Sequence, residues 1–153
     1  MKLSKKSEYA LRALIEIAGR GPHGIVQIPE ISAKENIPKK FLEAILLQLK
    51  NSGILRSKRG VGGGYSFSRS PADVTLGEVI RLMDGPLAPI SCVSQTAYER
   101  CTCPSEEECG LRSVMMEVRQ ALVDILDKKT IGDIIRLTAL RRQALQELLN
   151  FEI

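Results

Sequence analysis

The sequence has no tryptophan, few aromatic residues and no cysteine outside one short stretch. Aromatic residues make up only 4% of the 153 residues, so the core must be built from Leu, Ile, Val and Ala, a composition that favours helices. No apolar run approaches the roughly 18 residues that cross a membrane. The opening MKLSKKSEYALRALIEIAG is amphipathic and has no signal-peptide cleavage site. We therefore expect a cytoplasmic protein that has no contact with the membrane.

The four cysteines are Cys92, Cys101, Cys103 and Cys109, in the pattern C-x8-C-x-C-x5-C. Thiols stay reduced in the cytoplasm, so clustered cysteines there more often bind metal or carry out redox chemistry than form disulfides. Four thiolates can saturate zinc, but structural zinc sites use closely spaced pairs that this pattern lacks. The long, unequal spacing favours an iron–sulfur cluster. Zinc and a thiol redox switch remain open alternatives.

The positive charge is concentrated in one segment of the chain. Residues 34–59 contain seven basic and two acidic residues, a net +5 in a chain whose total is +4. A local positive surface is typical of proteins that bind a polyanion such as nucleic acid. The alternative is an ordinary solvated basic helix face.

Three helices are predicted before residue 52. The first begins near Ser4 and ends at GRGPHG. The second spans residues 27–36 and is expected to bury Ile28, Ile31 and Ala33. The third has Pro38 in its first turn and ends near Asn51. Its inward stripe consists of Leu42, Ile45, Leu46 and Leu49.

Residues 54–57 and 65–68 are β-prone runs on either side of a glycine-rich turn, which predicts a hairpin. Helix, short helix, helix and basic hairpin, in this order, indicate a winged helix-turn-helix. The predicted fold is mainly α with a small β-hairpin.

Lysines can neutralise phosphates, and a carboxylate can accept a hydrogen bond from a cytosine amino group. The candidate DNA-binding residues are Lys39, Lys40 and Glu43 on the third helix, with Lys58 and Arg59 in the wing.

The second half of the chain contains further helix signals. TLGE at residues 75–78 is a capping box that opens a helix. Residues 111–127 carry an apolar stripe, much of it at heptad spacing, that predicts a dimerisation helix. Thr130 caps a short helix, and RRQALQELLNFEI forms a final one. The predicted parts are the winged domain (1–84), the cysteine loop (85–110) and the dimerisation helix with a helical arm (111–153).

Three parts of the sequence together carry a resemblance to a known family: the opening MKLSKKSEYALRAL, the segment RGVGGGYSFSRSPADVTLGEVI, and the cysteine loop before a long helix. The chain resembles the IscR/NsrR family of bacterial winged-helix iron–sulfur regulators. The resemblance covers essentially the whole chain, and the RGxGGGY wing followed by LGEVI is its most specific part. It implies a homodimeric transcription regulator, not an enzyme, that binds a palindromic double-stranded DNA operator. Its iron–sulfur cluster, two-iron two-sulfur or else four-iron four-sulfur, would sense redox state, nitric oxide or iron–sulfur status.

By position, Cys92, Cys103 and Cys109 resemble the family's three cysteine ligands, with the extra Cys101 as the alternative to Cys103. The histidine found in some members three residues after the last cysteine is replaced here by Arg112. Other members use a carboxylate from the first helix of the other subunit, a position that Glu8 occupies in this sequence. The alternative role of Glu8 is an ion pair with Arg12. The alternative function is a cluster-free winged-helix regulator controlled by thiol oxidation, zinc or a partner protein.

Overall fold

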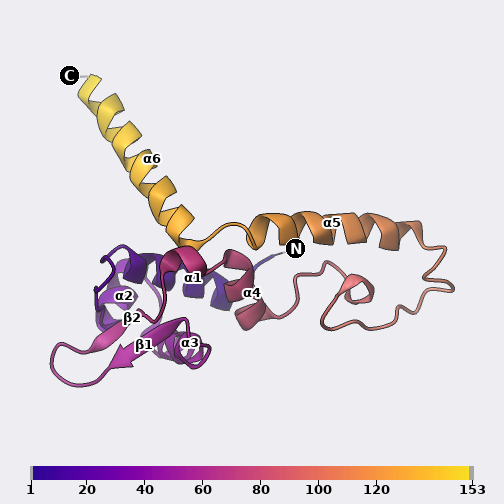
Figure 1. Cartoon of the computed structure of the whole chain (residues 1–153), viewed down its shortest axis with the longest axis horizontal. Coiled ribbons are helices and arrows are strands. Elements are labelled where there is room, and N and C mark those ends of the chain that lie inside the picture. Colours follow the sequence, from indigo (N-terminus) through magenta and orange to yellow (C-terminus); the bar gives the residue numbers. More distant parts are fainter. Residues whose placement is uncertain (1, 152–153) are drawn as a thin grey trace.

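The computed structural model describes residues 2–151 of the chain (Figure 1). Within this part the chain is mainly α-helical with one two-stranded hairpin, which confirms the predicted fold class. Single 3₁₀ turns lie at Pro71–Asp73 and, within the cysteine loop, at Ser91–Val93. The helices and strands are α1 (Lys5–Ala18), α2 (Ile28–Glu35), α3 (Lys39–Asn51), β1 (Leu55–Lys58), β2 (Gly64–Phe67), α4 (Leu76–Asp84), α5 (Gly110–Leu126) and α6 (Ile131–Phe151).

The winged domain is organised around the apolar faces of α1 and α3. The Ser4 hydroxyl accepts a hydrogen bond from the Ser7 N–H at 3.1 Å, so α1 begins where a serine N-cap predicts. The predicted inward stripe of α3 is confirmed, since all four of its residues are fully buried. The prediction for Ala33 was wrong: α2 has only eight residues, and of these Ile31 alone is buried while Ala33 is exposed.

The wing is the antiparallel pair β1–β2, in which Leu55 lies opposite Phe67. The backbone of Val26 bridges β2 through two hydrogen bonds to Tyr65, both 2.9 Å long. This bridge places the chain just before α2 against the wing. It also requires a glycine at position 64, where φ is +148° and a Cβ atom would come within 2.5 Å of the Val26 carbonyl oxygen.

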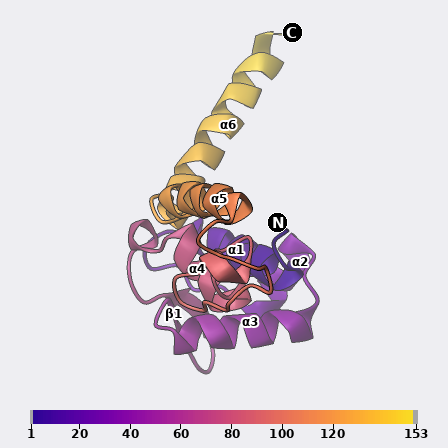
Figure 2. The ribbon, with the colours of Figure 1, turned by 90° about the vertical axis from the view of Figure 1, so that its right-hand side faces the viewer.

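The first turn of α6 belongs to the core of the winged domain. Ile131 is fully buried there, and its N–H donates to the Val74 carbonyl at 2.9 Å. The Arg81 guanidinium also holds Asp127 through two hydrogen bonds of 2.6 and 2.9 Å, which ties α4 to the end of α5. Figure 2 shows α5 nearly end-on above the winged domain, with α6 projecting away from that domain.

The predicted division of the C-terminal part into two helices was wrong. Residues 131–151 form one continuous helix, because TALRR in its middle consists mostly of good helix formers and includes no glycine or proline. Beyond its first turns, α6 projects away from the rest of the chain (Figure 1). None of the helices formed by residues 2–151 is long and apolar enough to cross a membrane.

Candidate nucleic-acid interface and cysteine site

The outer face of α3 carries the candidate DNA-reading residues. Lys39, Glu43 and Lys50 are spaced four and seven residues apart, so they share one exposed face of the helix, beside its buried stripe. Lys40 and Glu43 are also exposed, as the sequence predicts. The face is therefore open to a groove of DNA, with a carboxylate between two cations.

An open groove of about 500 Å³ lies between the start of α2, the outer face of α3 and the wing. Its lining contains four cationic side chains and no carboxylate: Lys39, Lys50, Lys58 and Arg59. Among the residues that the structure describes, none of these four forms an ion pair with a carboxylate. These cations lie along one groove and are not neutralised by the described carboxylates. They can therefore bind the phosphates of a nucleic acid backbone.

Three of the predicted DNA-binding residues, Lys39, Lys58 and Arg59, meet in this groove, whereas Lys40 and Glu43 do not line it. No sequence pattern indicated Gln27 or Tyr65, which also line the groove. They reach it through the Val26–Tyr65 bridge, a contact between segments 39 residues apart that no local pattern signals. Lys50 adds to the local positive charge of the sequence, but its place in the groove depends on the wing folding back beside α3.

The start of the cysteine loop is fixed to α5 by two arginines. Cys92 and Val93 are buried in a 3₁₀ turn. The Arg112 Nε atom donates to the Cys92 carbonyl at 3.3 Å, and an Arg119 nitrogen donates to the Val93 carbonyl at 3.0 Å. Arg112, which replaces the histidine of some family members, therefore anchors the backbone of a cysteine.

The other three thiols lie in the exposed part of the loop and at the start of α5. The Cys103 N–H donates to the Cys101 sulfur at 3.3 Å, which stabilises the Cys101 thiolate and lowers its pKa. The hydrogen bond with Cys101 raises the pKa of the Cys103 thiol to about 11. Cys109 is the N-cap of α5, and its sulfur accepts from the Arg112 N–H at 3.4 Å. Burial raises the pKa of Cys92.

Glu106 organises the polar side of this loop. One of its carboxylate oxygens accepts from the Tyr98 hydroxyl at 2.6 Å, and the other accepts from the Cys101 N–H at 2.7 Å. Both hydrogen bonds lower the pKa of Glu106. The carboxylate therefore stays ionised and holds the loop closed around Cys101.

The chemistry of this donor set suits a soft metal. All four cysteines are free thiols, and two of the sulfurs already accept backbone N–H bonds of the kind that tune thiolate ligands. In the described part of the chain, no three Cys, His, Asp or Glu side chains converge where a single metal ion could sit. The geometry therefore does not decide between zinc and a cluster with several metal atoms.

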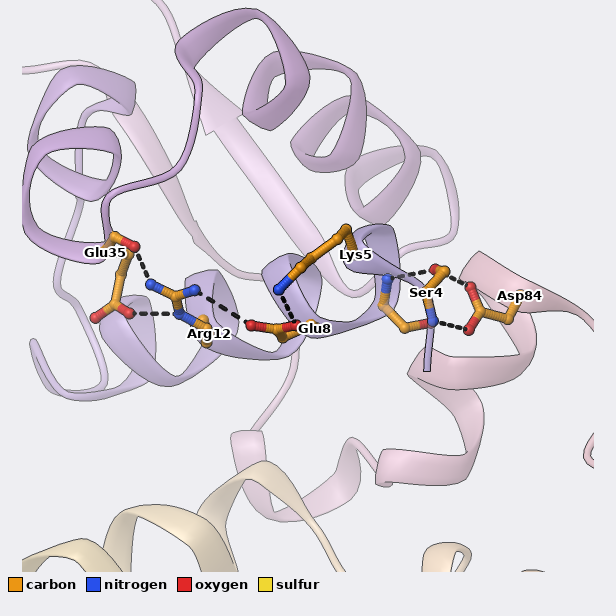
Figure 3. A network of polar contacts seen from close by, with 7 residues as sticks. Ser4, Lys5, Glu8, Arg12, Glu35 and Asp84 are labelled. Atoms are coloured by element: carbon orange, nitrogen blue, oxygen red, sulfur yellow. Dashed lines mark hydrogen bonds and ion pairs between the residues drawn. The ribbon is translucent and has the colours of Figure 1, made fainter. Parts of the chain in front are cut away.

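Glu8 lies on α1 in a chain of ion pairs, shown in Figure 3. Its carboxylate is 2.8 Å from Lys5 Nζ and 3.5 Å from an Arg12 nitrogen. The hydrogen bond from Lys5 lowers the pKa of Glu8. The predicted pair with Arg12 is present, but Arg12 lies closer to Glu35, at 3.1 Å. Within one chain no described contact joins Glu8 to a cysteine.

The N-terminus of α1 also contacts the residue that precedes the cysteine loop. Asp84, the last residue of α4, accepts hydrogen bonds from the Ser4 backbone, at 3.0 Å, and from the Ser4 hydroxyl (Figure 3). The same helix therefore carries Glu8 and holds one end of the segment that leads into the loop.

The helix order, the basic wing and the cationic groove define a winged-helix DNA-binding regulator. The profile of the Rrf2 family, described as "Iron-dependent Transcriptional regulator", matches residues 3–137. The chain belongs to this family, and the resemblance to NsrR-type regulators is confirmed.

Individual relatives agree with this assignment. An rrf2-like HTH-type transcriptional regulator of Rhodobacter capsulatus is 39% identical over 137 residues, covering 87% of this chain and 91% of its own. The NsrR transcriptional regulator of Bacillus subtilis is 30% identical over 136 residues, covering 89% and 91%. The structure of CymR, the global cysteine regulator of B. subtilis, superposes with a TM-score of 0.76 at 29% identity, covering 90% and 98%.

Proposed function

We propose that this protein is a homodimeric regulator whose affinity for a palindromic DNA operator is controlled by an iron–sulfur cluster at its cysteine loop. The observation that carries the DNA-binding part is the groove lined by four cations that have no carboxylate partner among residues 2–151. In a dimer joined through α5, two such grooves lie on one particle, as a two-fold symmetric operator requires. The exposed apolar stripe of α5, which contains no buried residue, supports that pairing.

Cys92, Cys103 and Cys109 are the proposed cluster ligands, with Cys101 as the alternative to Cys103 and Glu8 of a second subunit as the fourth ligand. The description of the family as iron-dependent supports iron as the metal. When bound, such a cluster supplies reversible one-electron chemistry and reactivity toward nitric oxide. We favour two iron atoms, with four as the alternative.

Contacts within the chain connect the cysteine loop to the DNA-reading face of α3. A change in the conformation of the loop can therefore reach that face. Arg112 and Arg119 hold the backbone beside Cys92 on α5, and Asp84 holds the start of the loop on α1. Because α1 packs directly on α3, a shift of α1 moves the recognition helix relative to the dimer helix. A regulator needs two states with different contacts of this kind.

A regulator controlled by thiol oxidation remains the second candidate. Cys101 is exposed, its pKa is lowered, and its sulfur lies next to Cys103, so it can act as a nucleophile. The two candidates differ in an observable property: the cluster absorbs visible light and the thiols do not.

We expect protein purified without oxygen to contain iron and sulfide and to absorb in the visible range. The Glu8→Ala variant should fold and dimerise normally, but should lose its cluster at least tenfold faster and show an altered spectrum. A carboxylate is a harder ligand than a thiolate, so its removal changes the spectrum while the three thiolates still hold the iron. Absorption spectra and iron release to a chelator measure both effects.

The matched control is Lys5→Ala, which removes the shortest ion pair of Glu8 but leaves its carboxylate. If Glu8→Ala and Lys5→Ala proteins have the same spectrum and the same cluster lifetime as the wild type, Glu8 acts only through its ion pairs. Colourless, iron-free protein from an oxygen-free preparation would favour the thiol-based candidate instead.

Replacing Glu43 by alanine should relax the sequence specificity of DNA binding. Phosphates repel a carboxylate, so its exposed position on the recognition face is explained best by a contact to a base. We expect discrimination at one operator position to fall by about 1–3 kcal/mol, with little loss of affinity for non-specific DNA. Binding to a set of single-base operator variants measures this. A uniform loss across all of them would contradict base reading by Glu43.

A further inference from the structure

A cleft of about 250 Å³ lies between α1, α2 and the N-terminal half of α6. None of the residues that line it belongs to the cysteine loop or to the groove beside the wing. Its volume equals that of about eight molecules of liquid water, so it has room for a small metabolite. Its lining combines apolar side chains with a few charged ones, as is typical of sites that bind small molecules.

The wall formed by α1 and α2 is built around a buried carboxylate. The Glu16 side chain is only 7% exposed, and both of its oxygens are paired, one with Arg20 at 3.3 Å and the other with Lys34 at 2.6 Å. A buried carboxylate is costly to leave without a cation. Glu16 therefore fixes Arg20 and Lys34 at the edge of the cleft, and its own oxygens are not available to a ligand.

The second carboxylate of the lining is also engaged. A Glu35 oxygen accepts a hydrogen bond from Arg12 Nε at 3.1 Å (Figure 3). Arg20, besides its contact with Glu16, holds Glu30 at 3.0 Å. The negative groups around the cleft are thus neutralised by cations of the same chain, and a ligand needs no positive charge to bind there.

Arg142 is the charged residue of the α6 wall, and it has no carboxylate partner among residues 2–151. On the same wall, the Thr138 hydroxyl donates to the Ile134 carbonyl at 2.9 Å, so its proton is already used. The free donors of this wall therefore belong to Arg142. The charged residues of the lining are three cations and two carboxylates, a net charge of +1: Arg20, Lys34 and Arg142 against Glu16 and Glu35.

Apolar side chains line the cleft from both sides. Ile15 on α1 and Ile135 on α6 are half-buried, so part of their surface still faces water. Ala139 lies one turn from both Ile135 and Arg142, and its small side chain leaves room beside the guanidinium. A hydrocarbon group in the cleft would remove the apolar surface from water. A guanidinium binds a carboxylate through two parallel hydrogen bonds, a geometry that an uncharged group cannot match.

We propose that this cleft binds a small monocarboxylate, with its carboxylate on Arg142 and its hydrocarbon part against Ile15 and Ile135. Such a ligand contacts α6 on one side and α1 on the other, so its binding holds α6 against the winged domain. The site uses neither the cysteines nor the groove beside the wing. It therefore stands or falls independently of the proposed function.

Titration of the full-length protein with isovalerate tests the chemical class of the ligand. Isovaleramide has the same shape without the charge, and we expect it to bind at least about tenfold more weakly, because charge-assisted hydrogen bonds are the stronger ones. Leucine adds an ammonium group and should also bind more weakly, because both carboxylates of the lining are engaged. Chemical shifts in NMR spectra measure all three affinities. No binding of isovalerate, or equal or tighter binding of either analogue, would overturn the proposal.

A pair of neighbouring arginines tests the location. Arg142→Gln should weaken isovalerate binding at least about tenfold, because it removes the charge that holds the carboxylate. Arg141→Gln is the matched control: Arg141 is exposed and does not line the cleft, so its replacement should leave the affinity unchanged.

The same variants have a second readout in stability. Isovalerate should raise the melting temperature of the wild type and of the Arg141→Gln protein, but not that of the Arg142→Gln protein, since only a bound ligand stabilises the folded chain. Ala139→Leu should abolish binding with Arg142 intact, because the larger side chain fills the cleft. Wild-type affinity in either the Arg142→Gln or the Ala139→Leu protein would place the ligand elsewhere and overturn the assignment.

Discussion

Replacing Lys39, Lys58 and Arg59 together by alanine is expected to lower operator affinity by about a thousandfold in 50 mM salt. The three side chains meet in one groove and have no carboxylate partners among the described residues. A dimer loses six of them. Each lost phosphate contact reduces the slope of log affinity against log salt by about 0.9, so the slope should fall by about 5. Affinities at several salt concentrations measure this change.

The matched control removes three positive charges elsewhere: Lys128, Lys129 and Arg141 are exposed and do not line the groove. Their replacement by alanine should change the salt slope by less than about 1, because distant charges make no phosphate contact. Equal losses in both triple variants would mean that net charge alone drives binding. The groove would then not be the DNA-binding surface.

The second large effect is expected on stability. Ile131→Ala should reduce the free energy of unfolding by about 3 kcal/mol, because it leaves a cavity in a fully packed core. For a chain of this size, this corresponds to a melting temperature lower by roughly 6–12 °C. Urea and thermal unfolding at one fixed protein concentration measure both values, since the stability of an oligomer depends on concentration.

Leu47→Ala is the control, because Leu47 is 51% exposed on α3 and its truncation should cost well under 1 kcal/mol. A small loss for Ile131→Ala as well would mean that α6 is not part of the cooperative core of the winged domain. The distinction matters for regulation. If α6 unfolds with the winged domain, the end of α5 is attached to that domain through Ile131 and through the Arg81–Asp127 pair.

Local spacing was sufficient to determine the helices before α6 and the wing from the sequence. The stripe of α3, the serine cap of α1 and the two short strands depend on residues within a few positions of one another, and the predicted strands agree to within one residue. The exposed positions of Lys40 and Glu43 follow from the same helical period. The sequence alone also placed the cysteine loop directly before the long helix, and its resemblance to a known family is confirmed.

Contacts between distant segments decided the rest. The groove includes Gln27 and Tyr65 only because Val26 pairs with the wing, and Ile131 is buried only because the chain returns to Val74 after α5. The ion pair of Arg12 with Glu8, the alternative role for Glu8, is present, but Arg12 lies closer to Glu35 on α2. In each case several partners are compatible with the local pattern. Packing of the core selects among them, because it fixes which segments lie side by side.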